Sequence, residues 1–251
     1  MKEKDTYIFG IHAVKEALLA GKEMDRVLVR RGPASDLMKG LLRELGRRQV
    51  PVQQVPVEKL NRITRKNHQG VIAMLSQISY SSIGDILPLV YEKGEEPLVL
   101  VLAGVSDVRN FGAIARSAEC AGVHAIVVPS MGSAAINADA IKTSVGALHR
   151  IPVCRHMDLV QVLKFLRESG LSVVAATEKA SDSLYQSGLD GPLAIVLGSE
   201  DRGISNALLK DADHWVRIPM KGKISSLNVS VAAGIILFEA VRQRDSAPGL
   251  K

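Results

Sequence analysis

The chain of 251 residues is long enough for one large or two modest domains with hydrophobic cores. No apolar run approaches the roughly 18–20 residues that a membrane-spanning helix needs, and no apolar stretch follows the N-terminal MKEKD, so we expect neither a membrane span nor a signal peptide. The formal net charge of +6 is uneven: residues 1–85 hold 15 Lys and Arg against 9 Asp and Glu, whereas residues 86–251 hold 17 of each. This excess indicates either an ordinary solvated surface or a module that binds a polyanion.

The first part of the chain predicts a compact α/β unit, which we place at residues 1–76. Residues 9–21 have helical periodicity, with Ile11, Val14 and Leu18 on one stripe. A second helix is expected at 35–48, with Ser35 as its N-cap. The other expected elements of this unit are strands at 26–30, 50–55 and 70–75 and a helix at 57–63.

Residues 77–96 are polar at both ends, with a short helix expected near 82–91, and we interpret them as a linker. The remaining residues, 97–251, alternate apolar strands with helices, which predicts a parallel sheet covered on both faces. The expected strands span 97–105, 124–130, 171–177, 193–199 and 215–220, and the expected helices span 110–121, 158–169, 205–210 and 226–242.

The two cysteines, Cys120 and Cys154, lack the spacing of metal ligands. We expect both to be buried thiols rather than a disulfide or a zinc site, and therefore expect no metal centre. This cysteine usage fits a protein of the reducing cytoplasm, where disulfides are rare.

The loop after the strand at 97–105 carries polar residues at the edge where parallel sheets bind ligands. Asp107 or Asn110 can cap the next helix, and Arg116 on its second turn can lie near the loop. A guanidinium near a helix N-terminus attracts phosphate, although a helix cap beside a surface arginine explains the same residues.

The loop at 196–205 holds Gly198, Glu200 and Gly203 after a buried strand. Its glycines permit a sharp turn that leaves backbone N–H groups open to a ligand, but a glycine-rich loop alone is a weak signal. The spacing matches neither the dinucleotide fingerprint nor a P-loop.

The segment 225–241 places four polar residues at the mouth of a helix rich in small residues, which we expect to be buried and closely packed. Polar groups at such a place are costly unless they bind something, and an N-cap explains only one of them. These four residues are Ser225, Ser226, Asn228 and Ser230.

In order and spacing, these three segments resemble motifs 1, 2 and 3 of the SpoU (TrmH-type) RNA ribose 2′-O-methyltransferases, which belong to the knotted SPOUT superfamily. The resemblance covers about 98–242. The N-terminal unit, with IFGIHAV near its start and NHQGV at 67–71, resembles that of the bacterial group that modifies a guanosine of 23S rRNA. The fold implied is a C-terminal α/β trefoil-knot domain at 97–251 with a parallel sheet, preceded by a small L7Ae/L30e-like α/β domain that binds RNA.

The resemblance also implies a cofactor, a reaction and an assembly. Family members bind S-adenosylmethionine, methylate a ribose 2′-hydroxyl of structured RNA and form homodimers whose sites take residues from both subunits. The positions that match the cofactor-binding residues are Thr177, Leu197, Gly198, Gly203, Ile218, Met220 and Leu227. The positions that match the catalytic residues are Asn110, Arg116, Glu200, Ser226 and Asn228.

Two features leave the mechanism open. The family assigns Arg116 as the base that activates the hydroxyl, but a guanidinium is effectively always protonated, so we favour a phosphate clamp that stabilises the alkoxide. We expect Glu200 to pair with an arginine rather than accept the proton. Val108 stands where the family usually has proline, which loosens the entry of the motif 1 loop.

Three other functions deserve comparison with an rRNA methyltransferase. A tRNA ribose methyltransferase shares the motifs, but the plainest of these enzymes lack the N-terminal unit. A non-catalytic RNA-binding factor of ribosome assembly would not need the five catalytic positions. A nucleotide-dependent oxidoreductase would need the dinucleotide fingerprint that is missing here.

Overall fold

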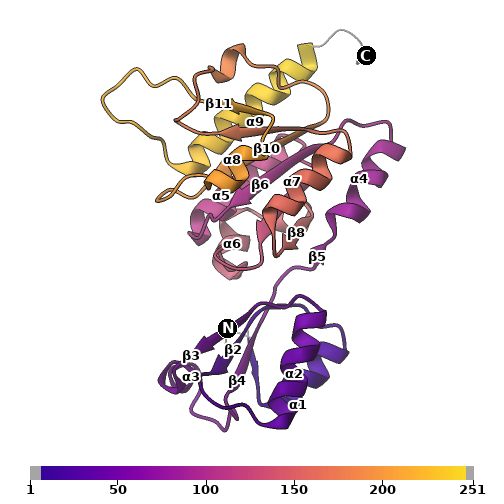
Figure 1. Ribbon diagram of the computed structural model, residues 1–251, viewed down its shortest axis with the longest axis vertical. Helices are drawn as coiled ribbons and strands as arrows, with labels where there is room; N and C mark the ends of the chain where they lie inside the picture. Colours follow the sequence, from indigo (N-terminus) through magenta and orange to yellow (C-terminus); the bar gives the residue numbers. More distant parts are fainter. Residues whose placement is uncertain (1–6, 247–251) are drawn as a thin grey trace. The chain divides into compact units, whose positions relative to one another are not determined.

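The computed structural model describes residues 7–246, which form two compact units that divide between Ser79 and Tyr80 (Figure 1). The ends of the two predicted domains, at residues 1–6 and 247–251, lie outside the described residues. No helix in the described part of the chain is both long and apolar enough to cross a membrane.

The N-terminal unit is a four-stranded mixed sheet in the order β1-β4-β2-β3. Side chains of α1 and α2 pack with Val27 and Val29 on one face, and Leu60 of α3 packs with Leu28 and Ile72 on the other. Ser35 caps α2 as expected, because its hydroxyl accepts a 3.3 Å hydrogen bond from the Met38 N–H. The elements are β1 Tyr7–Phe9, α1 Ile11–Leu19, β2 Met24–Arg30, α2 Asp36–Arg47, β3 Val52–Val55, α3 Val57–Ile63 and β4 Val71–Leu75.

The C-terminal unit is built on a seven-stranded sheet in the order β11-β9-β10-β6-β7-β8-β5. Every pair of neighbouring strands in it is parallel, which confirms the predicted sheet type. The strands are β5 Tyr80–Ser81, β6 Leu98–Ala103, β7 Ala125–Pro129, β8 Val153–His156, β9 Ser172–Ala176, β10 Leu193–Gly198 and β11 His214–Val216.

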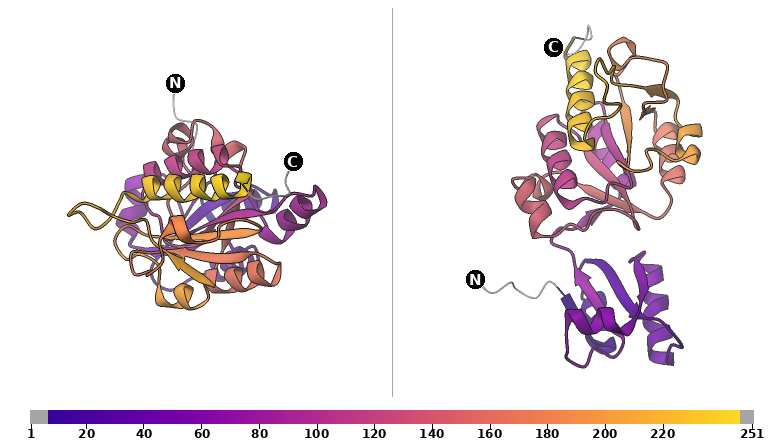
Figure 2. Two further views of the ribbon diagram at one scale, coloured as in Figure 1. Left: turned by 90° about the horizontal axis from the view of Figure 1, so that it is seen from above. Right: turned by 90° about the vertical axis from the view of Figure 1, so that its left-hand side faces the viewer.

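Helices cover both faces of this sheet in three layers (Figure 2). Apolar side chains of α4, α7 and α8 pack into the core on one face, and α5 lies between α6 and α9 on the other. The helices are α4 Ile83–Glu92, α5 Val108–Cys120, α6 Ala138–Thr143, α7 Leu159–Glu168, α8 Asn206–Lys210 and α9 Val229–Ser246, with short 3-10 turns at Ala147–His149 and Leu184–Gln186.

The central strands β6 and β10 position the loops that follow them. They pair along their whole length, from Leu193 beside Leu98 to Gly198 beside Ala103. The chain then leaves β6 for α5 on one face and leaves β10 for α8 on the other. A crevice forms where neighbouring parallel strands send their connections to opposite faces, and ligands bind there in open α/β sheets.

The segment 77–96 differs from the expected linker because most of it is part of the C-terminal unit. Tyr80 and Ser81 form β5, which pairs with β8, and α4 inserts Ile83 and Leu87 into the core. The apolar stripe of α4 is buried against the sheet, with Leu87 only 2 % exposed. The second unit therefore begins at Tyr80 and not at residue 97.

Two further expectations about burial were wrong in part. Cys154 is buried, and desolvation raises the pKa of its thiol to about 12, with a smaller contribution from Asp85. Cys120 is exposed near the end of α5 instead of buried. Helix α9 is not buried on all sides either, because Val231 and Phe238 are each 50 % exposed.

Replacement of Leu87 by alanine tests whether α4 belongs to the core. We expect Leu87→Ala to lower the free energy of unfolding by about 2–4 kcal/mol in a urea titration, because it leaves a cavity under the helix. Leu89→Ala is the matched control, since Leu89 is 56 % exposed on the same helix, and should change stability by less than about 0.5 kcal/mol. Equal small effects of the two substitutions would show that 77–96 acts as a linker.

Candidate active site

The loop after β6 directs Asn110 toward the crevice. Asp107 caps α5, because its Oδ1 accepts a 2.7 Å hydrogen bond from the Asn110 N–H. Of the two expected caps, Asp107 therefore fills the role, and the Asn110 side chain is left for other contacts. Gly112 lets α5 approach α6, since a Cβ there would lie 2.7 Å from Cβ of Thr143.

The loop after β10 is a tight turn that presents Glu200. The backbones of Ser199 and Gly203 exchange two hydrogen bonds, at 3.2 and 2.9 Å, and Gly203 has a φ of +62°. A Cβ on Gly198 would overlap the Gly203 carbonyl group and the Ile204 nitrogen. The two glycines thus close the loop that carries Glu200.

Asn110, Glu200 and Asn228 meet in one polar cluster, although they come from three different segments. Oε1 of Glu200 accepts hydrogen bonds from Nδ2 of Asn110 at 2.9 Å and from Nδ2 of Asn228 at 2.8 Å. Nδ2 of Asn228 also lies 3.1 Å from Oδ1 of Asn110. The structure thus brings together three of the five predicted catalytic residues, which we call the Asn–Glu–Asn cluster.

Asn228 also fixes the start of α9. Its Oδ1 accepts a 3.0 Å hydrogen bond from the Ser230 N–H, so it acts as the N-cap of the helix. The backbone N–H of Val229 lies 3.4 Å from Oε1 of Glu200, which places the carboxylate at the positive end of the helix. The N-cap explanation therefore holds for Asn228, but it does not account for the exposed Ser225 and Ser226.

Arg116 is not part of the cluster within this chain. Six residues along an α-helix turn a side chain by about 240°, so Arg116 and Asn110 occupy different faces of α5. Arg116 is exposed, and within residues 7–246 its side chain forms no hydrogen bond or ion pair. Among residues 7–246 the expected pairing of Glu200 with an arginine is also not formed, since the side chains that donate hydrogen bonds to Glu200 are the two asparagines.

A pocket of about 630 Å³ lies at the ends of β9, β10 and β11 and the start of α9. Its volume is in the range of small-molecule sites. Five of the seven predicted cofactor-binding residues line it, together with the predicted catalytic residue Ser226, whereas Gly198 and Gly203 are not among the lining residues. The five are Thr177, Leu197, Ile218, Met220 and Leu227.

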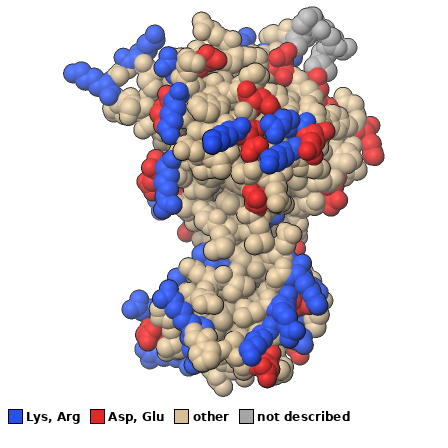
Figure 3. All heavy atoms as spheres, in the orientation of Figure 1, with Lys and Arg blue, Asp and Glu red and all other residues tan. Residues whose placement is uncertain are grey.

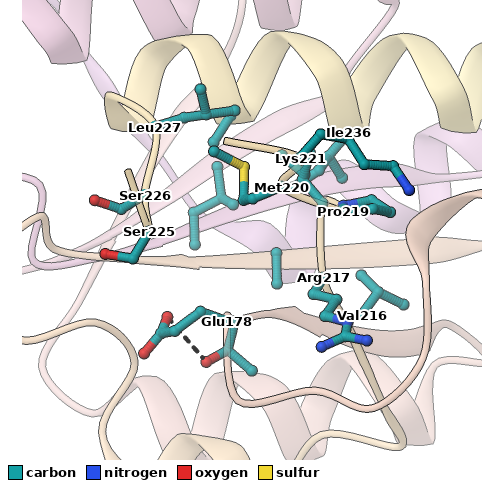
Figure 4. A pocket seen from close by; sticks show the side chains of 15 residues that line it. Glu178, Val216, Arg217, Pro219, Met220, Lys221, Ser225, Ser226, Leu227 and Ile236 are labelled. Carbon is teal, nitrogen blue, oxygen red and sulfur yellow. Dashed lines mark hydrogen bonds between the residues drawn. The ribbon is translucent and has the colours of Figure 1, made fainter. Parts of the chain in front are cut away.

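The walls of the pocket differ in chemistry (Figure 4). Leu227, Met220 and Ile236 form an apolar wall, and Glu178 and Arg217 lie across from it. Sequence reasoning missed Ile236, Glu178 and Arg217, together with Lys221. Two of them could have been predicted from the sequence, because Glu178 directly follows Thr177 and Arg217 directly precedes Ile218, and both neighbours were predicted to bind the cofactor.

The backbone of residues 218–227 is available to a ligand. Within the described chain, none of its N–H or C=O groups forms a hydrogen bond with another residue. Such free donors and acceptors beside apolar side chains suit a flat heteroaromatic ring with polar edges. The pocket thus combines an apolar slot with unused backbone groups, and the segment 225–228 connects it directly to the Asn–Glu–Asn cluster.

The structure of the Glu200 loop makes a prediction about Gly198. We expect Gly198→Ala to lower the free energy of unfolding by about 1–3 kcal/mol, because the added methyl group must displace the Gly203 backbone. Gly222→Ala is the control, since a Cβ there meets no atom within 4 Å. Urea titrations of both variants check this, and a fully stable Gly198→Ala protein would contradict the loop geometry.

Family models match both units of the chain. The model described as the SpoU rRNA Methylase family matches residues 97–238. The model described as RNA 2′-O ribose methyltransferase substrate binding matches residues 7–81. The substrate-binding match covers the N-terminal unit and extends through β5, and the methylase match covers most of the C-terminal unit but leaves out α4.

Two relatives and one solved structure are similar to this chain along nearly its whole length. The 23S rRNA (guanosine-2′-O-)-methyltransferase RlmB of Vibrio parahaemolyticus is 41% identical over 248 residues, which cover 96% of this chain and 98% of the relative. The protein of the same name from Photorhabdus laumondii is 40% identical over 244 residues, with 95% and 98% covered. The SpoU methyltransferase AviRb of Streptomyces viridochromogenes, solved in complex with AdoMet, is 26% identical with a TM-score of 0.61, covering 96% of this chain and 91% of its own. The extent of these matches shows that the chain belongs to the SpoU rRNA methylase family.

Proposed function

We propose that this protein transfers a methyl group from S-adenosylmethionine to the ribose 2′-hydroxyl of a guanosine in 23S rRNA. The observation that carries the proposal is the Asn–Glu–Asn cluster beside a pocket of suitable size. The names of the relatives that match nearly the full chain, and the AdoMet bound to AviRb, support the choice of substrate and cofactor.

In this proposal the pocket holds the methyl donor. Leu197, Met220 and Leu227 would hold the adenine ring of the donor, and the free backbone groups of 218–227 would bond its polar edges. Thr177 and Ile218 line the same pocket and complete the cofactor site, while Gly198 and Gly203 act indirectly by shaping the loop beside it. The segment 225–228 runs from this pocket to the cluster, so a bound donor would supply its methyl group near the cluster.

The cluster supplies the groups that orient the ribose. When bound, the donor would supply a methyl group on a sulfonium, which is a good leaving group, so the difficulty lies in the 2′-hydroxyl: its proton must pass to solvent as a carbon–oxygen bond replaces the carbon–sulfur bond. Asn110, Asn228 and Ser226 offer amide and hydroxyl groups that hold the ribose, and Glu200 fixes both amides. Arg116 clamps the target phosphate and stabilises the developing alkoxide, because a guanidinium stays protonated.

We assign Arg116 of one subunit to the active site of a second copy of the chain. It is exposed on α5 without a partner in the described chain, and α5 lies beside α9, which exposes Val231 and Phe238. A homodimer that covers these apolar side chains would bring Arg116 of each subunit toward the cluster of the other. The exposed Arg116 and the exposed apolar side chains of α9 both support this assembly.

The N-terminal unit captures the RNA in this proposal. Residues 1–85 carry the whole excess of positive charge, and the substrate-binding family model matches 7–81. RNA recognition by such a surface relies on phosphate contacts and on shape. We place the protein in the cytoplasm, where its rRNA substrate is made and assembled.

Replacement of Arg116 tests its assignment. Arg116→Ala should reduce methyl transfer to 23S rRNA by at least about 100-fold, because the alkoxide loses its stabilising charge. The affinity for S-adenosylhomocysteine, measured by calorimetry, should stay within about twofold of the wild-type value. Arg150→Ala, which removes an exposed arginine elsewhere on the same unit, is the control. Near-wild-type turnover of Arg116→Ala would refute the role.

Truncated proteins test whether the N-terminal unit binds the RNA and the C-terminal unit binds the cofactor. A protein that begins at Tyr80 should bind S-adenosylhomocysteine as the full chain does but lose most of its affinity for RNA, because the basic unit is gone. A protein that begins at residue 97 should fail to fold stably, because it lacks β5 and α4. If the chain that begins at Tyr80 kept full RNA affinity, the assigned role of the N-terminal unit would be wrong.

A further inference from the structure

Residues 218–227 connect β11 to α9 as a loop that hydrogen bonds fix only at its two ends. At one end the Arg217 N–H donates to the Asp182 carbonyl at 2.9 Å. At the other end Nδ2 of Asn228 donates to Oε1 of Glu200 at 2.8 Å. Between these anchors the backbone has no hydrogen bond with another described residue, and the loop extends away from the body of the C-terminal unit (Figures 1 and 2). We call it the β11–α9 loop.

The inner side of the β11–α9 loop faces the proposed cofactor pocket. Most of its residues line that pocket, and Met220 and Leu227 belong to the apolar wall (Figure 4). The residues of the loop that do not line the pocket are Gly222, Lys223 and Ile224, which form its tip. Since both ends are already anchored, a ligand that bonds the free backbone groups of the loop restrains the tip as well.

The outer part of the loop carries two positive charges that nothing in the described chain neutralises. Lys221 and Lys223 are the only charged residues between Arg217 and Asn228. Both are exposed, and their side chains form no hydrogen bond or ion pair within residues 7–246. Figure 3 shows Lys and Arg gathered at the upper left of the C-terminal unit, where this loop projects. The charge of the two lysines is therefore available to a polyanion.

These lysines lie within reach of the place where we put the target ribose. Lys223 precedes Asn228 by five residues, and a fully extended chain spans at most about 3.6 Å per residue, so their Cα atoms are within about 18 Å of each other. A ribose held at the Asn–Glu–Asn cluster brings the phosphates of its neighbouring nucleotides into this range. An ordinary solvated loop explains the lysines alone, but not their place on a segment that also lines the pocket.

A single loop that contacts two ligands couples their binding. The first ligand to bind restricts the loop and bears the loss of conformational entropy. The second ligand then meets a loop that is already ordered, so it binds more tightly. Such coupling is reciprocal, because the first ligand strengthens binding of the second by the same factor by which the second strengthens binding of the first.

We infer that the β11–α9 loop is an RNA contact of the catalytic unit that forms when the cofactor pocket is filled, with Lys221 and Lys223 binding phosphates beside the target nucleotide. This inference rests on the proposed function, because it states how that substrate and that cofactor assist each other at the same site. The N-terminal unit contributes to RNA affinity whether or not the pocket is filled, whereas the loop contributes only in the filled state. RNA therefore engages the catalytic unit preferentially when a methyl donor is present.

The test measures the affinity of the full-length protein for an unmodified 23S rRNA transcript, with and without saturating S-adenosylhomocysteine. The ratio of the two affinities isolates the loop, because the contribution of the N-terminal unit cancels. S-adenosylhomocysteine has no sulfonium charge, so it does not attract the RNA by itself. For the wild type we expect the ligand to tighten RNA binding by about 5–20-fold at about 100 mM salt. The slope of log affinity against log salt should become steeper by about 1–2.

Two loop variants and a matched control separate the lysines from the rest of the unit. In Lys221→Ala/Lys223→Ala the tightening should fall below about twofold, while RNA affinity without the ligand stays within about twofold of the wild-type value. Lys223→Ala alone should lower the ligand-dependent salt slope by about 1 and bind S-adenosylhomocysteine normally, because its side chain does not line the pocket. The control Lys164→Ala/Lys210→Ala removes two exposed charges from α7 and α8 and should keep the full tightening.

Trypsin reports the ordering of the loop without RNA, because it cleaves after Lys221 and Lys223. S-adenosylhomocysteine should slow these two cuts by at least about fivefold, since an ordered loop is a poor protease substrate. Cuts in the N-terminal unit of the same sample are the control and should keep their rates. Mass spectrometry of the fragments identifies each cut.

The inference fails if S-adenosylhomocysteine leaves the RNA affinity of the wild type unchanged, or if Lys221→Ala/Lys223→Ala is tightened as the wild type is. An equal loss in the control variant, or unchanged cleavage of the loop by trypsin, would also overturn it. Failure of the proposed function is distinguishable, because wild-type protein would then transfer no methyl group from S-adenosylmethionine to the transcript. A wild type that methylates the transcript but shows no coupling would contradict this inference alone.

Discussion

The carboxylate of Glu200 connects the three segments from which the site is built. Its Oε1 accepts hydrogen bonds from Asn110 and Asn228, which lie in α5 and just before α9. Hydrogen bonds to an ionised acceptor are about twice as strong as neutral ones, so this one oxygen holds motif 1 and motif 3 against motif 2. The parallel pairing of β6 with β10 makes the contact possible, because it brings the two loops to the same point of the sheet edge.

Much of this fold follows from sequence patterns. The long apolar strands β6, β7, β9 and β10 are buried on both faces, and such runs are readable. The shorter strands β1, β5 and β8 were missed because two to four residues carry too little periodicity to be distinguished from a loop. The linker interpretation failed for a different reason. Polar flanks obscured the apolar stripe of Ile83, Leu87 and Val90, which was present at helical spacing.

The site was predictable to the extent that its motifs have a fixed sequence. Resemblance identified the Asn–Glu–Asn cluster and five residues of the pocket wall, but the roles of Gly198 and Gly203 needed coordinates, since neither lines the pocket. For Arg116 the sequence spacing was misleading. Its spacing from Asn110 suggested proximity, whereas helical geometry sends it to another face, where its side chain has no hydrogen-bond or ion-pair partner among the described residues. The trefoil knot stays a prediction of the resemblance, because periodicity carries no information about threading.

Methyl transfer to a defined atom is the central claim, and mapping the product tests it most directly. Purified protein would be incubated with S-adenosylmethionine that carries a deuterated methyl group and with an unmodified 23S rRNA transcript, and the digest analysed by mass spectrometry. We expect label on the ribose of one guanosine, in a fragment that resists nuclease because its 2′-oxygen is methylated. Label on a base, or no label from protein that binds S-adenosylhomocysteine, would contradict it.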